Sequence, residues 1–261
     1  MNDIFEKIAE QRKLNCEFAL CVVTNTKGST PRDSGAKMLV YKDGSIFGTI
    51  GGGRIEKKII EDALNILKIK KPGFFHYDLL KELQMCCGGS MDIYIEPVMK
   101  RNKLYIFGAG HTGLALARKA VDFDFEITVI DDRNEYLGQI NIDRVNKING
   151  KYKEVTPLLL FDEQTYITIM TYSHPLDREI LSFCLEKPHA YIGMIGSRRK
   201  VEVTKRLFEE EGIGTIEDIE RVDMPMGIDI GAEGPDEIAI SILAKLLAVK
   251  NKTEILCKTN Q

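Results

Sequence analysis

The residues with the clearest chemical implication are three glycines near the middle of the chain. Gly108, Gly110 and Gly113 have the spacing GxGxxG, directly after a short apolar run and directly before a helical pattern. In a strand–turn–helix unit such glycines let the backbone approach a pyrophosphate at the start of the helix. Asp131 and Asp132 follow about 20 residues later, at the end of the next strand-like run, where an acidic side chain accepts ribose hydroxyls. The spacing therefore predicts a turn that binds a nucleotide-like ligand.

Other glycines and basic residues suggest further places for an anion. The run Gly51, Gly52 and Gly53 separates a strand-like segment from a helical one, either as a tight turn or as a cradle for a phosphate. His111, inside the GxGxxG turn, either packs there or contacts ligand phosphate. Basic and hydroxyl side chains suited to anionic groups also stand in one loop and at one helix start, with ordinary solvation as the alternative. They are Arg32, Ser197, Arg198 and Arg199.

Three residues are candidates for a chemical step. Cys87 follows Cys86 and precedes two glycines, and an accessible thiolate there could bind a soft metal or carry sulfur. The role of Cys86 stays open. His174 and Asp177 follow a strand-like run, at the end of the strand where ligands of open parallel sheets bind, although a purely structural turn is the alternative. The remaining four cysteines are scattered singly, which is typical of small buried apolar residues.

The elements that must position these residues fall into two parts. Residues 1–100 combine a helix near 2–14, strand-like runs at 18–26, 36–41, 45–50, 73–80 and 90–98, and a helix near 54–68. This pattern predicts a small α+β domain with an antiparallel or mixed sheet. Residues 101–261 alternate strands (103–107, 126–130, 165–173, 190–196) with helices (112–121, 177–186, 198–211, 235–248). Alternation of this kind predicts an α/β, Rossmann-like parallel sheet with helices on both faces.

Composition excludes several classes of protein. The chain has 261 residues and a net charge of −3, so it lacks the basic excess expected of a large nucleic-acid interface. No apolar run approaches the roughly 20 residues that span a bilayer, and the first residues do not have the pattern of a signal peptide. We therefore expect a cytoplasmic protein without a membrane span.

The order of the motifs is more specific than any one of them. The segments GSTPR, GTIGGG, CGG, IFGAGH, VIDDR, SHPLD, YIGMIGSRRK and MGIDIGAEGPDE follow one another along the chain. This series resembles the xanthine dehydrogenase accessory (XdhC/CoxI) family over about residues 10–250. The resemblance implies an accessory domain followed by a Rossmann domain. It also implies that the protein binds molybdenum cofactor, supports its sulfuration and passes it to a xanthine dehydrogenase-type hydroxylase of purine metabolism.

The resemblance assigns roles to particular residues. Cys87 matches the family's CGG segment and would bind the metal or relay sulfur from a cysteine desulfurase-type donor. His174 and Asp177 match its His–x2–Asp pattern, whereas the segment between Arg133 and Thr165 diverges.

Two other functions stay open from the residues: an NAD(P)-dependent oxidoreductase, and a non-catalytic adaptor that docks a hydroxylase and a sulfurtransferase. The sequence does not decide whether the protein is itself an enzyme. A homodimer is expected, because it would cover the edge or face of a small antiparallel sheet.

Overall fold

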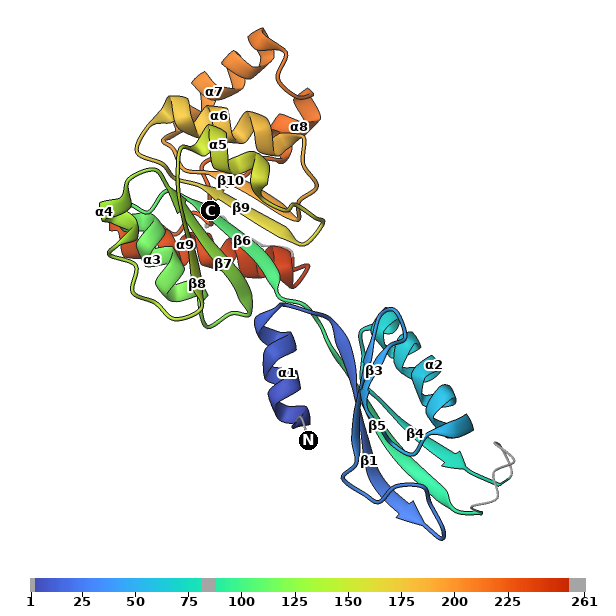
Figure 1. Cartoon of the computed structure of the whole chain (residues 1–261). Helices are drawn as coiled ribbons and strands as arrows, with labels where there is room; N and C mark the ends of the chain where they lie inside the picture. Colours follow the sequence, from blue (N-terminus) through green and yellow to red (C-terminus); the bar gives the residue numbers. More distant parts are fainter. Residues whose placement is uncertain (1–2, 81–87, 254–261) are drawn as a thin grey trace. The chain divides into compact units, whose positions relative to one another are not determined.

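The computed structural model describes residues 3–80 and 88–253, and the chain divides into two compact units, Met1–Lys100 and Arg101–Gln261 (Figure 1). Each unit has its own sheet and its own apolar core. The α/β class predicted from the sequence, with a smaller α+β unit first, is confirmed. In the described residues no helix has the length and apolar character needed to cross a membrane.

The first unit is built on a five-stranded sheet with the order β3-β2-β1-β5-β4, in which every neighbouring pair is antiparallel. Strands β2 and β3 form a hairpin whose turn contains Gly44, with Val40 opposite Ile46. The unit's elements are α1 (Ile4–Lys13), β1 (Phe18–Lys27), β2 (Lys37–Tyr41), β3 (Ile46–Gly48), α2 (Gly53–Ile69), β4 (Gly73–Asp78) and β5 (Ser90–Val98).

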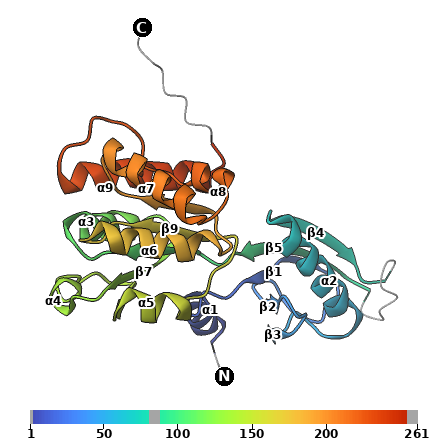
Figure 2. The same ribbon diagram turned by 90° about the horizontal axis from the view of Figure 1, so that it is seen from above.

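Helix α2 covers one face of this sheet because its apolar residues recur every three or four positions (Figure 2). Ile55, Ile59, Ala63 and Ile66 are buried against strands β1, β2 and β5. Their burial fixes the start of α2, and with it the glycine junction that precedes the helix.

The second unit is a parallel sheet with the strand order β10-β9-β6-β7-β8. Its strands are β6 (Asn102–Phe107), β7 (Phe125–Asp131), β8 (Val145–Asn149), β9 (Thr165–Ile169) and β10 (Tyr191–Met194). From β6 the chain first builds outward through β7 and β8, and then returns to add β9 and β10 on the other side. The carboxyl ends of β6 and β9 thus flank the position where the strand order reverses, which is where open α/β sheets bind ligands.

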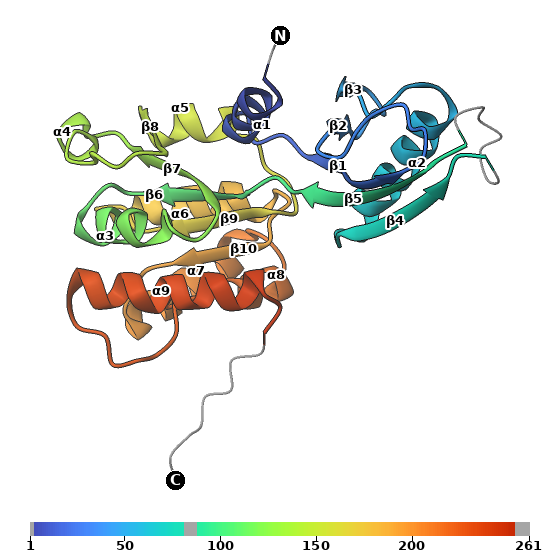
Figure 3. The ribbon, with the colours of Figure 1, turned by 90° about the horizontal axis from the view of Figure 1, so that it is seen from below.

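Helices cover both faces of the parallel sheet, as its alternating sequence pattern predicts. Helices α3 and α9 lie side by side and pack on one face (Figure 3), whereas α6, α7 and α8 contribute to the core on the other. The helices are α3 (His111–Ala120), α4 (Asn134–Leu137), α5 (Tyr152–Val155), α6 (His174–Leu185), α7 (Arg198–Glu211), α8 (Ile216–Arg221) and α9 (Gly234–Lys250), with a short 3-10 turn η1 (Thr156–Leu158).

One boundary differs from the expectation in a way that matters for the site. The strand predicted over 165–173 ends at Ile169, and the helix expected from about 177 begins at His174. The backbone N–H and the hydroxyl of Thr171 both donate to the Asp177 carboxylate, at 2.9 and 2.6 Å. These bonds turn the chain away from the sheet after β9. Pro175 fits the first turn of α6, because backbone N–H groups in a first turn have no acceptor within the helix and their loss costs nothing.

Candidate functional site

In the first unit, three motifs singled out in the sequence come together. A Cβ atom on Gly51 would lie 2.6 Å from Cγ of Pro31, so the triglycine junction packs directly on the loop that carries Arg32. Ser29 of that loop pairs with Gly88, and a Cβ atom on Gly89 would collide with the backbone oxygen of Ser29. The hydroxyl-rich loop therefore lies between the triglycine junction and the two glycines that follow Cys87.

The triglycine junction already binds a carboxylate of the same chain. One Glu56 oxygen accepts hydrogen bonds from the Thr49 hydroxyl at 2.6 Å, from Ile50 N at 3.3 Å and from Gly52 N at 3.2 Å. Gly51, Gly52 and Gly53 all have positive φ, between 66° and 137°, a backbone conformation that glycine adopts more easily than other residues. Glu56 thus uses the N–H group of Gly52, which was a candidate for a ligand phosphate. Binding of an external anion by these glycines stays a prediction.

The cysteines divide into two groups. Cys86 and Cys87 lie outside the described residues, so the predicted sulfur or metal chemistry at Cys87 has no geometry here. Cys21 and Cys184 are completely buried, and burial raises the pKa of each thiol to about 12. These two are small core residues. Within the part of the chain that the structure describes, no three His, Cys, Asp or Glu side chains gather as a metal site.

In the second unit, the GxGxxG turn has the geometry that its spacing predicts. Gly108 has a φ of 111°, and a Cβ atom there would collide with the carbonyl of Met170, the residue directly after β9. A Cβ atom on Gly113 would collide with the Gly108 carbonyl, so helix α3 can approach β6 only with glycine at this position. Gly110 has open space around its Cβ position, in front of the first turn of α3, where His111 is exposed. The space in front of this helix start is compatible with the approach of a pyrophosphate.

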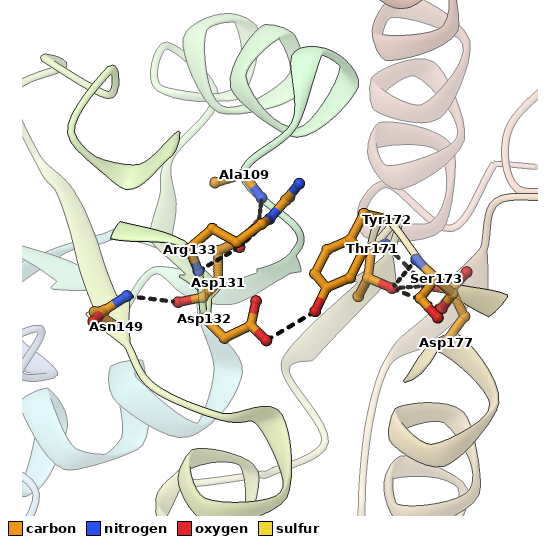
Figure 4. Close-up of polar contacts among 9 residues, drawn as sticks. All are labelled: Ala109, Asp131, Asp132, Arg133, Asn149, Thr171, Tyr172, Ser173 and Asp177. Carbon is orange, nitrogen blue, oxygen red and sulfur yellow. Dashed lines mark hydrogen bonds and ion pairs between the residues drawn. The ribbon is translucent and has the colours of Figure 1, made fainter. Parts of the chain in front are cut away.

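Asp131, the expected acceptor for a ribose hydroxyl, is fully buried and has its hydrogen bonds within the protein (Figure 4). One carboxylate oxygen accepts from Ala109 N at 2.6 Å and from Arg133 Nη2 at 2.9 Å. The other accepts from the Arg133 backbone N and from its Nε, both at 2.9 Å. Burial on its own raises the pKa of Asp131, but these bonds and the Arg133 charge outweigh it, and the net pKa is lowered.

Arg133 is also held between two aromatic rings. Its guanidinium carbon lies 4.0 Å from the centre of the Tyr136 ring and 4.2 Å from that of the Tyr172 ring. Tyr172 follows β9 and donates its hydroxyl to Asp132 at 3.0 Å, so this contact joins the carboxyl ends of β7 and β9 across the glycine turn (Figure 4). The cluster made by Asp131, Asp132, Arg133, Tyr136 and Tyr172 therefore lies at the switch point of the sheet.

His174 and Asp177 are neighbours, as their spacing of three residues in a helix requires. His174 Nδ1 lies 3.2 Å from the Asp177 carboxylate, which is buried, while about two fifths of the His174 side chain is exposed. Burial raises the pKa of Asp177, and the hydrogen bonds from Thr171 and the nearby His174 only partly oppose this effect. In this pair Asp177 can orient the His174 imidazole, which can then transfer a proton to or from a ligand.

A basic pocket lies beside this pair, between the first turns of α6 and α7. It has a volume of about 390 Å³, and Val203 is its one apolar lining residue. The other lining residues have basic or hydroxyl side chains: His174, Arg178, Ser197, Arg199, Lys200 and Thr204. Ser197 also borders a second pocket of about 470 Å³, lined by Arg198 and by the loop that leads to α9. The structure thus brings Ser197, Arg199 and His174 together, and it places Arg198 on the other side of Ser197.

Both units match known families. Residues 104–246, more than half of the chain, match the XdhC Rossmann domain, and residues 12–78 match the XdhC and CoxI family. The chain belongs to the XdhC family. The resemblance inferred from the order of the motifs is thereby confirmed.

Individual XdhC relatives are longer than this chain. YqeB of Escherichia coli K12, an uncharacterized protein, is 38% identical over 255 residues, which cover 95% of this chain and 46% of YqeB. A protein of Bacillus subtilis strain 168, named as a probable subunit of xanthine dehydrogenase, is 26% identical over 63% of this chain and 48% of that protein. This chain therefore spans about half the length of these curated relatives.

A crystal structure from Bacillus halodurans, described as a xanthine dehydrogenase, superposes with a TM-score of 0.54. It shares 21% identity, and the match covers 97% of each chain. At this identity the likeness concerns the fold.

Sequence reasoning did not single out several residues of this XdhC site. Arg133, Tyr172 and Arg178 acquire their roles only through neighbours on other turns or strands. Arg178 had a detectable signal, because it stands four residues after His174 and so shares its face of a helix. Arg133 had a weaker one, since it follows directly on the two aspartates that end β7.

Proposed function

We propose that this XdhC protein binds molybdenum cofactor, supports its sulfuration and delivers it to a xanthine dehydrogenase-type molybdenum hydroxylase. Membership of the family and the name of the Bacillus subtilis relative, which refers to xanthine dehydrogenase, support an accessory role for that enzyme. The observation that carries the proposal is the basic pocket beside His174 and Asp177, between the first turns of α6 and α7. It offers an anionic cofactor several positive side chains at the carboxyl edge of the sheet.

The pocket suits the phosphate of a pterin cofactor on three physical grounds. Arg199 and Lys200 stand in the first turn of the 14-residue helix α7, whose free N–H groups and dipole favour an anion. Arg178 adds a planar guanidinium that can hold two phosphate oxygens. The net charge of the chain is −3, so anion binding here must depend on local groups rather than on a general positive field.

Two sets of residues would carry the chemistry of the cargo. Cys87 would bind the metal or pass sulfur from a cysteine desulfurase-type donor. His174, oriented by Asp177, would hold or move a proton beside the bound cofactor. A homodimer is part of the proposal, as a means of covering the small antiparallel sheet.

Release of small molecules from the purified protein tests cofactor binding. The protein is prepared from a host that makes molybdenum cofactor, and the released pterins are identified by mass spectrometry. The Arg199→Ala, Lys200→Ala double variant should retain about tenfold less pterin, because it loses two charge-assisted contacts. Arg206→Ala, an exposed arginine further along α7, is the matched control and should retain the wild-type amount. Wild-type protein that carries no pterin would contradict the proposal.

Activation of a co-expressed hydroxylase tests the role of Cys87. The Cys87→Ala variant should leave the client hydroxylase with the cofactor in its unsulfurated form and therefore inactive. Cys16→Ala, which changes a half-buried cysteine of the same unit, should support full activity. Full client activity with Cys87→Ala would exclude the sulfur-relay role.

A further inference from the structure

We infer that the carboxyl end of β7 contains a ribose-binding subsite in which Asp132, rather than Asp131, accepts the hydroxyl groups of a nucleotide. The inference is independent of the molybdenum cofactor proposed above, because it concerns the glycine turn of the second unit and a different ligand group. The subsite combines Asp132 with Tyr152 and the start of α3, and in this structure the Tyr172 side chain occupies it.

Asp131 has no capacity left for a ribose. Both of its oxygens accept two hydrogen bonds each, from Ala109 N and three donors of Arg133, and the side chain is fully buried. Displacing Arg133 would leave a buried carboxylate without its cation, which is strongly unfavourable. A ligand is therefore expected to leave this ion pair intact.

Asp132, the next residue, has capacity to accept donors. Its Oδ1 is buried and has no hydrogen-bond partner among the described residues, while its Oδ2 accepts only the Tyr172 hydroxyl among them. A buried carboxylate oxygen without a donor is costly, so its occurrence points to a donor that a ligand supplies. The ribose of a nucleotide offers two adjacent hydroxyls that match the two oxygens of one carboxylate.

Tyr152 supplies a second orphan group. Its side chain is 2% exposed, and its hydroxyl has no hydrogen-bond partner in the described part of the chain. Burial raises the pKa of Tyr152, and the charges of Asp131 and Asp132 add to the effect, so this hydroxyl lies within the field of the two carboxylates. Two buried oxygens without a described partner, Asp132 Oδ1 after β7 and the Tyr152 hydroxyl at the start of α5, thus lie at the same end of the sheet.

Tyr172 occupies the position that the ligand would take. More than half of its surface is exposed, its hydroxyl binds Asp132 and its ring stacks on Arg133. A hydroxyl and an aromatic ring in these places reproduce two features of a nucleoside, its sugar hydroxyl and its base. Because Tyr172 is held by these exposed contacts, we expect it to turn outward when a nucleotide binds.

The charge balance selects against a phosphate on the ribose. Arg133 is the cation that could bind a 2′-phosphate, but its charge is neutralised by Asp131 and the Tyr136 ring stacks on its guanidinium. The carboxylate of Asp132 would repel such a group. The subsite therefore fits nucleotides with free ribose hydroxyls, with their pyrophosphate at Gly110 and the start of α3.

Calorimetric titration of the full chain with defined nucleotides tests the inference without molybdenum or a client enzyme. ADP should bind about tenfold more tightly than 2′-deoxy-ADP, which lacks one hydroxyl. NAD should bind more tightly than NADP, which differs only by the 2′-phosphate. Tyr172→Phe, which removes the competing hydroxyl from Asp132, should strengthen ADP binding several-fold.

Asp132→Asn should weaken ADP binding about tenfold and remove the discrimination between ADP and 2′-deoxy-ADP. Asp143→Asn, an exposed aspartate of the same unit, should change neither. Equal binding of ADP and 2′-deoxy-ADP by the wild type, tighter binding of NADP than of NAD, or no binding of ADP would each overturn the subsite. So would discrimination that survives in a folded Asp132→Asn variant. None of these results bears on pterin retention, so the two proposals fail separately.

Discussion

At the scale of single residues, the pKa values of the two buried aspartates of the second unit are shifted in opposite directions. Asp131 and Asp177 are both fully buried, and burial raises the pKa of each. Arg133 and the Ala109 N–H reverse this effect at Asp131, whereas Thr171 and His174 do not reverse it at Asp177. Asp131 is therefore a structural anion, while Asp177 is suited to exchange a proton with its surroundings.

Removing the partner of the structural anion should reveal its contribution to stability. Arg133→Ala is expected to lower the free energy of unfolding by about 3 kcal/mol near neutral pH, because a buried carboxylate loses its cation. The pKa of Asp131 is lower in the folded protein than in the unfolded chain. Its ionised form therefore adds stability above the usual Asp pKa of about 4.

That contribution is lost as the pH falls through the lowered pKa of the folded protein. The difference between wild type and Arg133→Ala should accordingly shrink at acidic pH. Urea unfolding curves at neutral pH and below about pH 4 measure it. Arg118→Ala, an exposed arginine on α3, is the control and should have little effect at either pH. A loss for Arg133→Ala that does not depend on pH would contradict this account.

At the scale of elements, the junction between β6 and α3 shows that three glycines of one motif have different physical tasks. Gly108 and Gly113 are required by close approach of backbone atoms. The Met170 carbonyl, directly after β9, approaches Gly108, and the Gly108 carbonyl approaches Gly113. Gly110 meets no such obstacle, so its lack of a side chain serves access from solvent. The motif thus combines packing positions with a position open to a ligand.

This division of tasks predicts opposite outcomes for two similar substitutions. Gly113→Ala should destabilise the second unit by more than about 2 kcal/mol, because the added methyl group collides with backbone that cannot move freely. Gly110→Ala should change stability by less than about 1 kcal/mol, since its Cβ position is open and its φ of −66° suits alanine. Thermal and urea denaturation of both variants measure the difference, and equal losses would refute it.

At the scale of the whole molecule, each unit has the parts required for independent folding. The second unit has an open sheet of five parallel strands, with an apolar cluster on each face of the sheet. The first has its own cluster between α2 and the antiparallel sheet. Burial of apolar surface within each unit is the main source of folding free energy, and it does not require the other unit.

A fragment of residues 101–261 should therefore fold by itself. We expect it to unfold cooperatively in urea and to show a dispersed NMR spectrum typical of a packed core. It should also bind ADP as the full chain does, if the ribose subsite at Asp132 is correct. A fragment that stays unfolded, while the full chain is stable, would show that the second unit depends on the first.

The sequence by itself determined the class of fold and the order of its elements. Period-two and helical apolar patterns depend on neighbouring residues, so they located α2, α7 and every strand except β8 within a few positions. The edge strand β8 was missed, because its five residues VNKIN have no run of apolar side chains. The GxGxxG spacing also determined the turn at Gly108, because its requirement for close packing is local. Short elements such as α4 and α5 escaped prediction, since four residues carry too little periodicity.

Only the tertiary structure decided which side chains are available to a ligand. Asp131 and Asp132 are adjacent acids in the sequence, yet Arg133 pairs with Asp131 only. One carboxylate oxygen of Asp132 has no hydrogen-bond partner among the described residues. Glu56 likewise occupies one N–H group of the triglycine run, that of Gly52, which the sequence alone leaves free. Such pairings depend on how loops meet in space, over distances in the chain that local patterns do not encode.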